Sequence, residues 1–338
     1  MIKKRKLAVI FSAGFFIVTL LAGFLTASYV YTNLSNVLLN RSFAQLQTIS
    51  NLKTANARIL IQTYKDRASG LSSAVTIQDD LYKIKNSQGG ADTIKSLVDY
   101  FKTYKLPAWQ LLDSISILNE KGTLIGSTDS KSAVGSDMSA DPLFLEGRSA
   151  PYMSDLASDG ISGKNYFLLS TPINRNNEFV GILVYRFPAN ELFNIVGGDI
   201  GFGTAGESYI INKDSYLITP SPFLHGANAG ILTQFVDSVN SKKCKADVKE
   251  YLANSSLNHT AGDNFVSFLD FRGVVVDGRH DIIPEMNWCL LTEVDKDAIW
   301  NGQKMNIIII SILILSAIVI CASALGFLIG HRLENNCK

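Results

Sequence analysis

A nine-residue pattern that occurs twice decides the fold of this chain. The sequence reads ILNEKGTLI from Ile117 to Ile125 and IINKDSYLI from Ile210 to Ile218. Both copies place an apolar pair, an asparagine, a polar turn and a second apolar pair in the same order, which is typical of a β-hairpin. The second copy begins 93 residues after the first. We interpret the pair as an internal repeat; a chance likeness between two asparagine turns is the alternative.

A second predicted strand pair follows each copy. After the first, Tyr166–Ile173 turns through residues 174–178 into Phe179–Phe187. After the second, residues 264–276 lead through Pro284 to Trp288–Val294. Short apolar runs divided by turn residues predict antiparallel strands. The sequence therefore indicates two similar α/β modules.

A long helix is predicted ahead of the modules. No glycine or proline occurs from Phe24 to Ser69, and apolar residues recur at helical spacing at Leu39, Phe43, Leu46, Ile49, Leu52 and Ile59. We expect this helix to end at Gly70 and a second helix to cover Ala91–Tyr104. The stripe predicts a homodimer contact; packing of the stripe on the chain's own modules is the alternative.

Two charge-free runs, residues 7–40 and 306–330, contribute much of the 47% hydrophobic content. Each is long enough to cross ~30 Å of hydrocarbon as a helix, and we expect spans at 7–30 and 305–330. Cations precede the first span (Lys3, Lys4, Arg5, Lys6) and follow the second (His331, Arg332, Lys338). The positive-inside rule then places segments 1–6 and 331–338 in the cytoplasm and 31–304 outside the plasma (inner) membrane. A cleaved signal peptide is the alternative for the first run.

Composition and motifs exclude several classes of function. The net charge of +1 provides no broad basic field for nucleic acid. Neither span carries the ionisable residues that transporters generally use. Gly201, Gly203 and Gly206 match G-x-G-x-x-G but precede a predicted strand, so we interpret them as turn glycines. We expect no enzyme, no cofactor and no metal site.

Of the four cysteines, Cys244 and Cys289 fall in the segment expected outside the membrane, whereas Cys321 lies in the second span and Cys337 in the tail. An oxidising compartment permits one bridge, and we predict a disulfide between the first two. Two buried free thiols are the alternative.

Several motifs, taken in order, resemble a known family. They are the first hairpin, Gly135–Ser139 (GSDMS), Gly160–Gly163 (GISG) before Ser170–Ile173 (STPI), Gly203–Ile211 (GTAGESYII) and the closing segment 271–295. Together they resemble the double Cache sensor domain, a PAS-like extracytoplasmic module of prokaryotic chemoreceptors, sensor kinases and cyclic-dinucleotide enzymes, over about residues 32–304. The resemblance implies an α+β fold: a long N-terminal helix with two PAS-like antiparallel-sheet modules, distal at about 70–195 and proximal at about 196–300.

The resemblance also implies a ligand site in the distal module. Where amino-acid-binding relatives carry an Arg, an aromatic pair, a Tyr-x-Asp and a later Asp, this chain has Asp141, Leu143-Phe144, Tyr152-x-Ser154 and Arg186. Losing two carboxylates and gaining a guanidinium favours a carboxylate or another anion. The candidate residues are Arg186, Arg148, Tyr152, Phe144, Ser154 and Tyr166. The alternatives are an exposed strand arginine and ordinary core aromatics.

We therefore expect a membrane-anchored, extracytoplasmic small-molecule receptor for signal transduction or chemotaxis, acting on a cytoplasmic signalling partner. One alternative is the sensor region of a truncated histidine kinase or cyclic-dinucleotide enzyme. The other is a surface interaction module that senses nothing.

Overall fold

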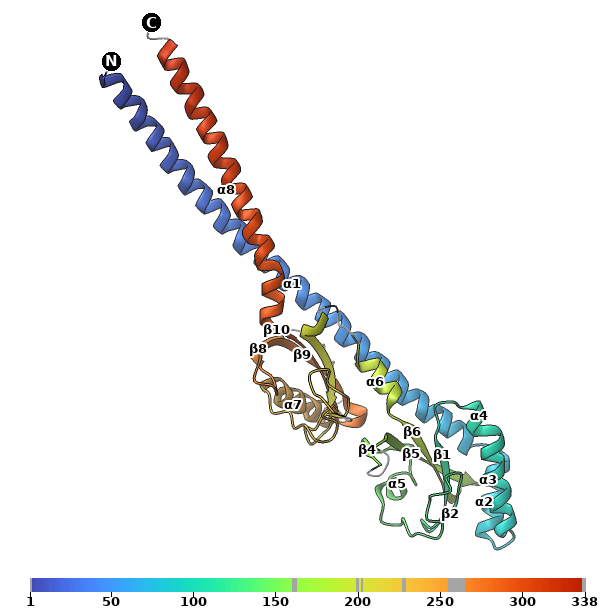
Figure 1. Cartoon of the computed structure of the whole chain (residues 1–338). Coiled ribbons are helices and arrows are strands. Elements are labelled where there is room, and N and C mark those ends of the chain that lie inside the picture. The colour runs from blue at the N-terminus through green and yellow to red at the C-terminus, as the bar shows by residue number, and fades with distance from the viewer. Residues whose placement is uncertain are drawn as a thin grey trace. The chain divides into compact units, whose positions relative to one another are not determined.

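The computed structural model describes residues 2–159, 163–198, 201, 203–226, 229–254 and 265–335. Residues 160–162 of the GISG motif and 336–338 of the tail lie outside that part of the chain. The chain divides into two compact units, one of Met1–Gln47 with Val294–Lys338 and one of Thr48–Glu293. Figure 1 shows the elements of both.

The terminal unit consists of apolar helix. It contains the start of α1 (Ile2–Ser72) and α8 (Lys296–Asn335). Within these helices Ala13–Leu34 and Met305–Gly326 are long and apolar enough to cross a membrane. Protein covers only 6% and 12% of the two segments, unlike the core helices of a soluble protein. Gly23 permits close packing, because a Cβ there would lie 2.5 Å from Leu315 Cδ1.

The first sheet of the central unit carries its longer helices on one face and a short helix on the other. Its strand order is β2-β1-β6-β5-β3, with β4 paired to β5. The strands are β1 (Ser114–Asn119), β2 (Leu124–Ser127), β3 (Tyr152–Met153), β4 (Ala157–Ser158), β5 (Asn165–Arg175) and β6 (Glu178–Pro188). The helices around it are α2 (Val75–Lys85), α3 (Ala91–Tyr100), a π-helical turn (Phe101–Lys105), α4 (Leu106–Ala108), α5 (Pro142–Leu145) and α6 (Asn190–Val196).

Segment Thr48–Ser72 of α1 packs against this sheet through aromatic contacts. The Tyr64 ring stacks on Phe187 with centroids 4.1 Å apart. The Tyr185 hydroxyl, fully buried, donates to the Ala68 carbonyl at 2.9 Å. Alternation along β6 places Tyr185 and Phe187 on this face, which leaves Val184 and Arg186 on the other.

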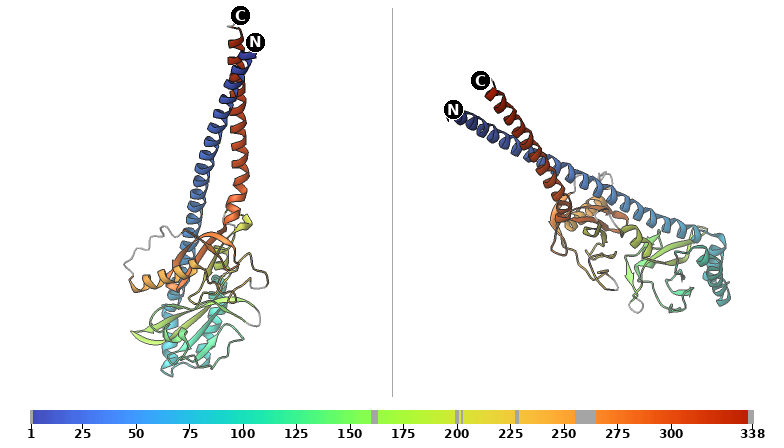
Figure 2. Two further views of the ribbon diagram at one scale, coloured as in Figure 1. Left: turned by 90° about the vertical axis from the view of Figure 1, so that its left-hand side faces the viewer. Right: turned by 45° about the horizontal axis from the view of Figure 1, so that its top comes forward.

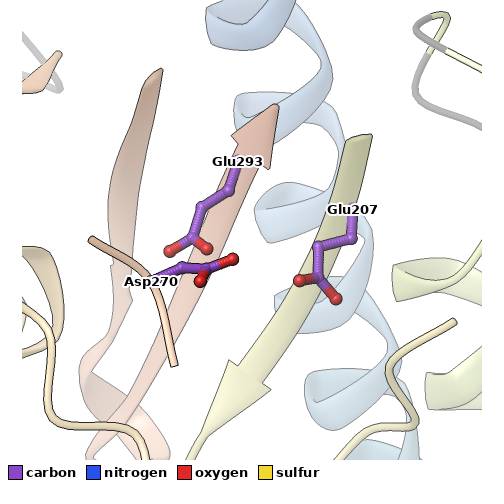
Figure 3. A group of neighbouring side chains, drawn as sticks. All are labelled: Glu207, Asp270 and Glu293. Carbon is purple, nitrogen blue, oxygen red and sulfur yellow. The ribbon is translucent and has the colours of Figure 1, made fainter. Parts of the chain in front are cut away.

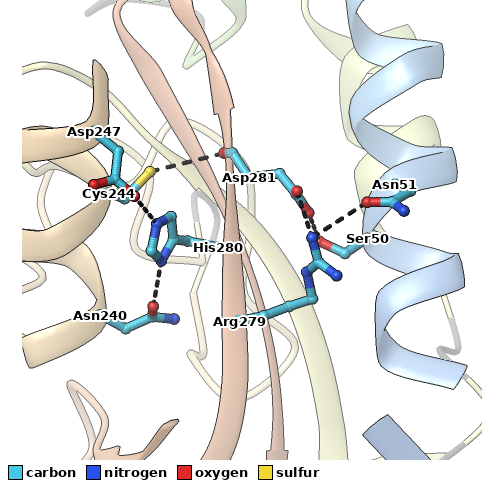
Figure 4. A network of polar contacts seen from close by, with 8 residues as sticks. All are labelled: Ser50, Asn51, Asn240, Cys244, Asp247, Arg279, His280 and Asp281. Carbon is cyan, nitrogen blue, oxygen red and sulfur yellow. Dashed lines mark hydrogen bonds and ion pairs between the residues drawn. The ribbon is translucent and has the colours of Figure 1, made fainter. Parts of the chain in front are cut away.

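The second sheet lies between α7 and the same segment of α1 (Figures 1 and 2). Its strand order is β7-β10-β9-β8. The elements are β7 (Gly206–Ile211), α7 (Val239–Ala253), β8 (Val266–Leu269), β9 (Val275–Ile283) and β10 (Trp288–Asp295), with 3-10 turns at Gly203–Ala205 and Pro284–Met286. Along β9, His280 contacts α7, whereas Arg279 and Asp281 contact α1 (Figure 4).

The two predicted hairpins close with the same turn geometry, although in the second copy Leu217 forms only an isolated bridge with Ile211. Asn119 Oδ1 accepts from the backbone N–H groups two and four residues ahead, at 3.0 and 2.9 Å. Asn212 Oδ1 does the same, at 3.0 Å to both. The residues that close the turns, Gly122 and Ser215, have φ of 87° and 68°, the left-handed conformation that such turns require. Asp270 makes the same pattern a third time, between β8 and β9.

Two helix predictions need correction. Helix α1 ends at Ser72 rather than Gly70, since an isolated glycine costs only about 1 kcal/mol in a helix that packing supports. The predicted stripe is the packing face only in part, because Leu46 is fully buried whereas Leu52 and Ile59 are 58% and 63% exposed. The buried residues from Thr48 onward include small, polar and large side chains: Ser50, Lys53, Ala57, Ile61, Tyr64 and Ala68. Lys53 is accommodated because its Nζ donates to the Val196 carbonyl at 2.6 Å.

Leu52 is exposed and so is available for contact with a second copy of the chain, and the homodimer stays a prediction. We expect cysteines placed at Gln45 or Asn51 to cross-link two copies in membranes, because apolar side chains on a free helix face gain by mutual burial. Uniformly monomeric products at every position tested along the helix would contradict the dimer.

Cys244 of α7 and Cys289 of β10 form a disulfide, with Cα atoms 6.0 Å apart. We expect mass spectrometry of protein unfolded and alkylated without reductant to find neither residue labelled, because bridged sulfurs do not react. Cys321 is the free cysteine of the described residues and provides the positive control for labelling. Labelling of both Cys244 and Cys289 would show that no bridge forms.

Candidate functional site

The face of the first sheet turned away from α1 is polar around Arg186 and apolar farther along the strands, where Leu118 and Ile182 belong to a buried cluster. Strand pairing sets Ser114 and Leu168 opposite Arg186, and Ser116 opposite Val184. Residues directly opposite in neighbouring strands share a face. We call this surface the Arg186 face, and its members are Ser114, Ser116, Ser127, Tyr152, Ser154, Tyr166, Ser170, Val184 and Arg186.

Arg186 is held by an aromatic ring with part of its hydrogen-bonding capacity unused. Its guanidinium carbon lies 3.8 Å from the centroid of the Tyr166 ring, a cation–π contact. The nearest carboxylate oxygens, of Asp129 and Asp159, lie 3.8 and 3.9 Å from its Nη atoms, beyond hydrogen-bonding distance. Its Nε is buried and has no hydrogen-bond partner within the described part of the chain. The side chain is 23% exposed, so an acceptor from solution can reach it.

Tyr152 and Ser154 lie on β3 and just after it. The Ser154 hydroxyl accepts from the Leu168 N–H at 3.0 Å and donates to the Asp155 carbonyl at 2.8 Å. It therefore fixes the chain beside β5. The half-buried Tyr152 pairs with Ser170, and burial, followed by the charge of Glu146, raises the pKa of its phenol. The neutral phenol remains able to donate a hydrogen bond.

Phe144 and Arg148 lie toward the other end of β6. The Phe144 ring is buried with Val184 and packs edge-on against Phe179 at 6.1 Å. The Arg148 guanidinium lies 5.3 Å from the Phe179 ring. Since Phe179 and Arg186 are seven residues apart on one strand, they are separated by roughly 20 Å. The structure thus does not bring Arg148 beside Arg186.

The sequence reasoning missed the acidic neighbours of Arg186. It held that the site lacks carboxylates, whereas Asp129 and Asp159 flank the guanidinium. Both aspartates lie in irregular segments, and no spacing motif marks them. The serines were easier to find, because Ser114 and Ser116 alternate with buried isoleucines, which is the pattern of a strand with one polar face.

The Arg186 face is connected to the second sheet through Asp155, the residue after Ser154. Asp155 Oδ1 accepts from Trp288 Nε1 at 3.0 Å, and the Trp288 ring packs against Phe167 with centroids 5.5 Å apart. Trp288 begins β10, which continues into α8. A displacement of residues 152–155 therefore has a direct physical route to β10.

A buried polar network ties β9 to the helices on both sides of the second sheet (Figure 4). The His280 ring nitrogens lie 2.6 Å from Asn240 Oδ1 and 2.8 Å from Asp247 Oδ2 on α7. On the α1 side, Asp281 accepts from Ser50 and pairs with Arg279 at 2.7 Å. Burial lowers the pKa of His280 more than Asp247 raises it.

The lowered pKa of His280 predicts acid sensitivity. The unfolded chain takes up a proton on this residue below pH ~6.5, whereas the native chain does so only at lower pH. Stability is therefore lost as the pH falls from ~6.5 through the native pKa. We expect His280→Gln to reduce the difference between the unfolding midpoints at pH 7 and pH 5. His225→Gln, at an exposed site, is the matched control. An unchanged difference in His280→Gln would contradict the assignment.

The fold is that of the double Cache-type ligand-binding domains of chemoreceptors and sensor kinases, as the sequence resemblance predicted. No protein-family model matches the sequence, and no curated protein matches it. Solved structures do match. The sensor domain of the V. cholerae histidine kinase DctB is 13% identical, with a TM-score of 0.53, and the match covers 77% of this chain and 98% of that one.

Two chemoreceptor domains also match. The ligand-binding domain of Campylobacter jejuni Tlp3, in complex with 4-methylisoleucine, is 14% identical with a TM-score of 0.53, covering 78% of this chain and 94% of that one. That of Pseudomonas fluorescens CtaA, in complex with L-serine, is 14% identical with a TM-score of 0.50, covering 76% and 99%. Identities this low establish the fold and leave the ligand to be argued from the residues of this chain.

Proposed function

We propose that this chain is a membrane-anchored sensor that binds a small molecule on the Arg186 face of a membrane-distal module. Two apolar helices flank a central unit with the fold of sensory domains, which supports this reading and a non-catalytic role for the central unit. The contact between Trp288 and Asp155 supports a route from the ligand through β10 to α8. The cations at both termini favour cytoplasmic ends.

One observation carries the proposal: the guanidinium of Arg186 stacks on Tyr166 while its Nε is buried without a partner. A ligand carboxylate can bind this planar fork in a two-pronged geometry that a point charge does not offer. Serine hydroxyls on the same face provide further donors and acceptors for its polar groups. We therefore propose a small carboxylate as the ligand class.

Asp129 and Asp159 favour a second candidate. Their carboxylates lie 3.8 and 3.9 Å from the guanidinium. They are placed to accept hydrogen bonds from the ammonium group of a ligand whose carboxylate binds Arg186. An α-amino acid has that arrangement of charges. The neighbouring domains that were solved with 4-methylisoleucine and L-serine support this candidate.

A thermal-shift screen of the detergent-solubilised chain separates these possibilities. Mono- and dicarboxylates form one set and α-amino acids the other. A ligand at 100 times its Kd should stabilise the native state by about 2.7 kcal/mol. Stabilisation by simple acids supports the carboxylate proposal, and stabilisation by amino acids alone supports the second candidate. If no compound of either set stabilises the chain or binds in calorimetry, the proposed ligand classes are wrong.

A further inference from the structure

Three carboxylates converge inside the second module (Figure 3). Glu207 lies on β7, Asp270 in the turn between β8 and β9, and Glu293 on β10. They are 1%, 6% and 1% exposed. One oxygen from each lies within 4.8 Å of the others. Carboxylates this deeply buried are normally paired, protonated or bound to a cation.

The described protein groups around the cluster leave Glu293 Oε2 without a partner. The Tyr209 hydroxyl donates to Glu293 Oε1 at 2.8 Å, and the Ser221 hydroxyl donates to Glu207 Oε2 at 2.6 Å. Glu293 Oε2 is buried without a hydrogen-bond partner in the ranges that the structure describes, and Figure 3 shows its carboxylate turned toward Asp270. An unpartnered carboxylate oxygen at this depth is a position that a cation can occupy.

The turn at Asp270 does not require a charged side chain, since a neutral asparagine can accept the same hydrogen bonds. In the two equivalent turns, neutral Asn119 and Asn212 accept the same pair of backbone hydrogen bonds. Asp270 Oδ1 makes these bonds with the N–H groups of Arg272 and Val274. Its other oxygen lies 2.5 Å from Arg272 Nε. Three carboxylates facing this one guanidinium leave a charge of −2 when all are ionised, which a divalent cation balances.

The internal repeat places the acidic cluster at a position in the second module that corresponds to the surroundings of Arg186 in the first. The 93-residue offset between the hairpins aligns Glu207 with Ser114, and Ser114 lies directly opposite Arg186 in the first sheet. Glu207 thus stands where the first module has Ser114, the residue beside the guanidinium of Arg186.

We propose that Glu207, Asp270 and Glu293 bind a divalent cation, of which Ca²⁺ fits best. Ca²⁺ takes oxygen ligands at about 2.3–2.6 Å in flexible geometry, so it tolerates carboxylates held by three separate elements. Mg²⁺ demands near-ideal octahedral geometry at about 2.0–2.1 Å and usually keeps several waters, which suits a buried cluster of protein ligands less well. An all-oxygen site also disfavours Zn²⁺ and Cu²⁺, which select nitrogen and sulfur. The ion would join β7, the β8–β9 turn and β10. This site departs from the expectation that the chain binds no metal.

The test uses the full chain in detergent, stripped with a chelator and dialysed. Thermal unfolding and calorimetry are recorded with CaCl2, MgCl2 or MnCl2 alone. We expect CaCl2 to raise the unfolding temperature and to bind at one site. Glu207→Gln and Glu293→Gln should each weaken Ca²⁺ binding by about tenfold or more. Without metal, both variants should unfold at or above the unfolding temperature of the metal-free parent, because glutamine keeps the shape of glutamate and removes its buried charge. Glu285→Gln, outside the cluster, is the matched control.

The metal-free unfolding temperature separates loss of the site from loss of the fold. Folded Gln variants that no longer respond to CaCl2 support the proposal. The proposal is overturned if millimolar CaCl2, MgCl2 and MnCl2 leave the parent unchanged, since protons then balance the cluster. A response that the Gln variants and Glu285→Gln share equally also overturns it, because the ion would then bind elsewhere.

Discussion

Replacing Arg186 with alanine is expected to weaken binding of the proposed carboxylate ligand by roughly 2–5 kcal/mol, the cost of removing one partner of a desolvated charge pair. The ligand carboxylate would lose both prongs of the guanidinium and would face Asp129 and Asp159, whose Oδ2 atoms lie within 4 Å of the guanidinium. Titration calorimetry of the parent and the variant, with the acid that the screen identifies, measures the difference.

Two further variants test whether binding depends on the charge of Arg186, on the geometry of its guanidinium or on its position in the sheet. Arg186→Lys keeps the charge but loses the planar fork, so we expect intermediate binding. Arg175→Ala removes an arginine at the other end of the β5–β6 hairpin, where it pairs with Asp79 at 2.6 Å. It should bind the ligand as the parent does. Acid binding that is indifferent to Arg186→Ala would show that the ligand does not use this guanidinium.

Replacing Trp288 with alanine is expected to lower the free energy of unfolding by about 3–5 kcal/mol, the cost of removing a large side chain from a packed core. The indole is fully buried and belongs to the core cluster that includes Phe167 and Ile210, from the first and second sheets. Its loss would also leave Asp155 without the donor Nε1. Chemical unfolding followed by circular dichroism measures the change.

Trp288→Phe is the matched variant, because it retains a ring against Phe167 while removing only the N–H donor and part of the volume. We expect a smaller loss, about 1–3 kcal/mol, set mainly by the weaker satisfaction of the partly buried Asp155 carboxylate. If Trp288→Ala costs less than about 1 kcal/mol, the indole does not hold the two sheets together as the structure implies.

The elements that could be predicted from sequence are those with strong local signals. The asparagines at 119 and 212 accept the hydrogen bonds of their own turns, so the local sequence predicts both turns. The absence of glycine and proline from Phe24 to Ser69 predicts the long helix α1. Its packing face could not be predicted, because the residues that meet the sheets there include Lys53 and Ala57, while Leu52 stays exposed. Tertiary contacts, such as that of Lys53 with the Val196 carbonyl, override hydrophobic periodicity at such positions.

The candidate site was predictable only in part, for a related reason. Arg186 was identified because it occupies a position that the family resemblance marks. Its partners come from distant segments: Asp129 and Asp159 meet it only because β1 and β5 pair on either side of β6. The acidic cluster is similar, since Glu207 and Glu293 are brought together by the pairing of β7 with β10. Strand order and register set these contacts, and no local spacing encodes them.

The central claim is that a small molecule binds on the Arg186 face, and hydrogen–deuterium exchange of the detergent-solubilised chain with saturating ligand tests it most directly. We predict the strongest new protection in the first module, at segments 114–119, 152–159 and 178–188, with weaker protection at 288–295 through Trp288. Arg186→Ala should abolish all of it at the same ligand concentration. Protection confined to the second module, with these three segments unchanged in the parent, would contradict the account.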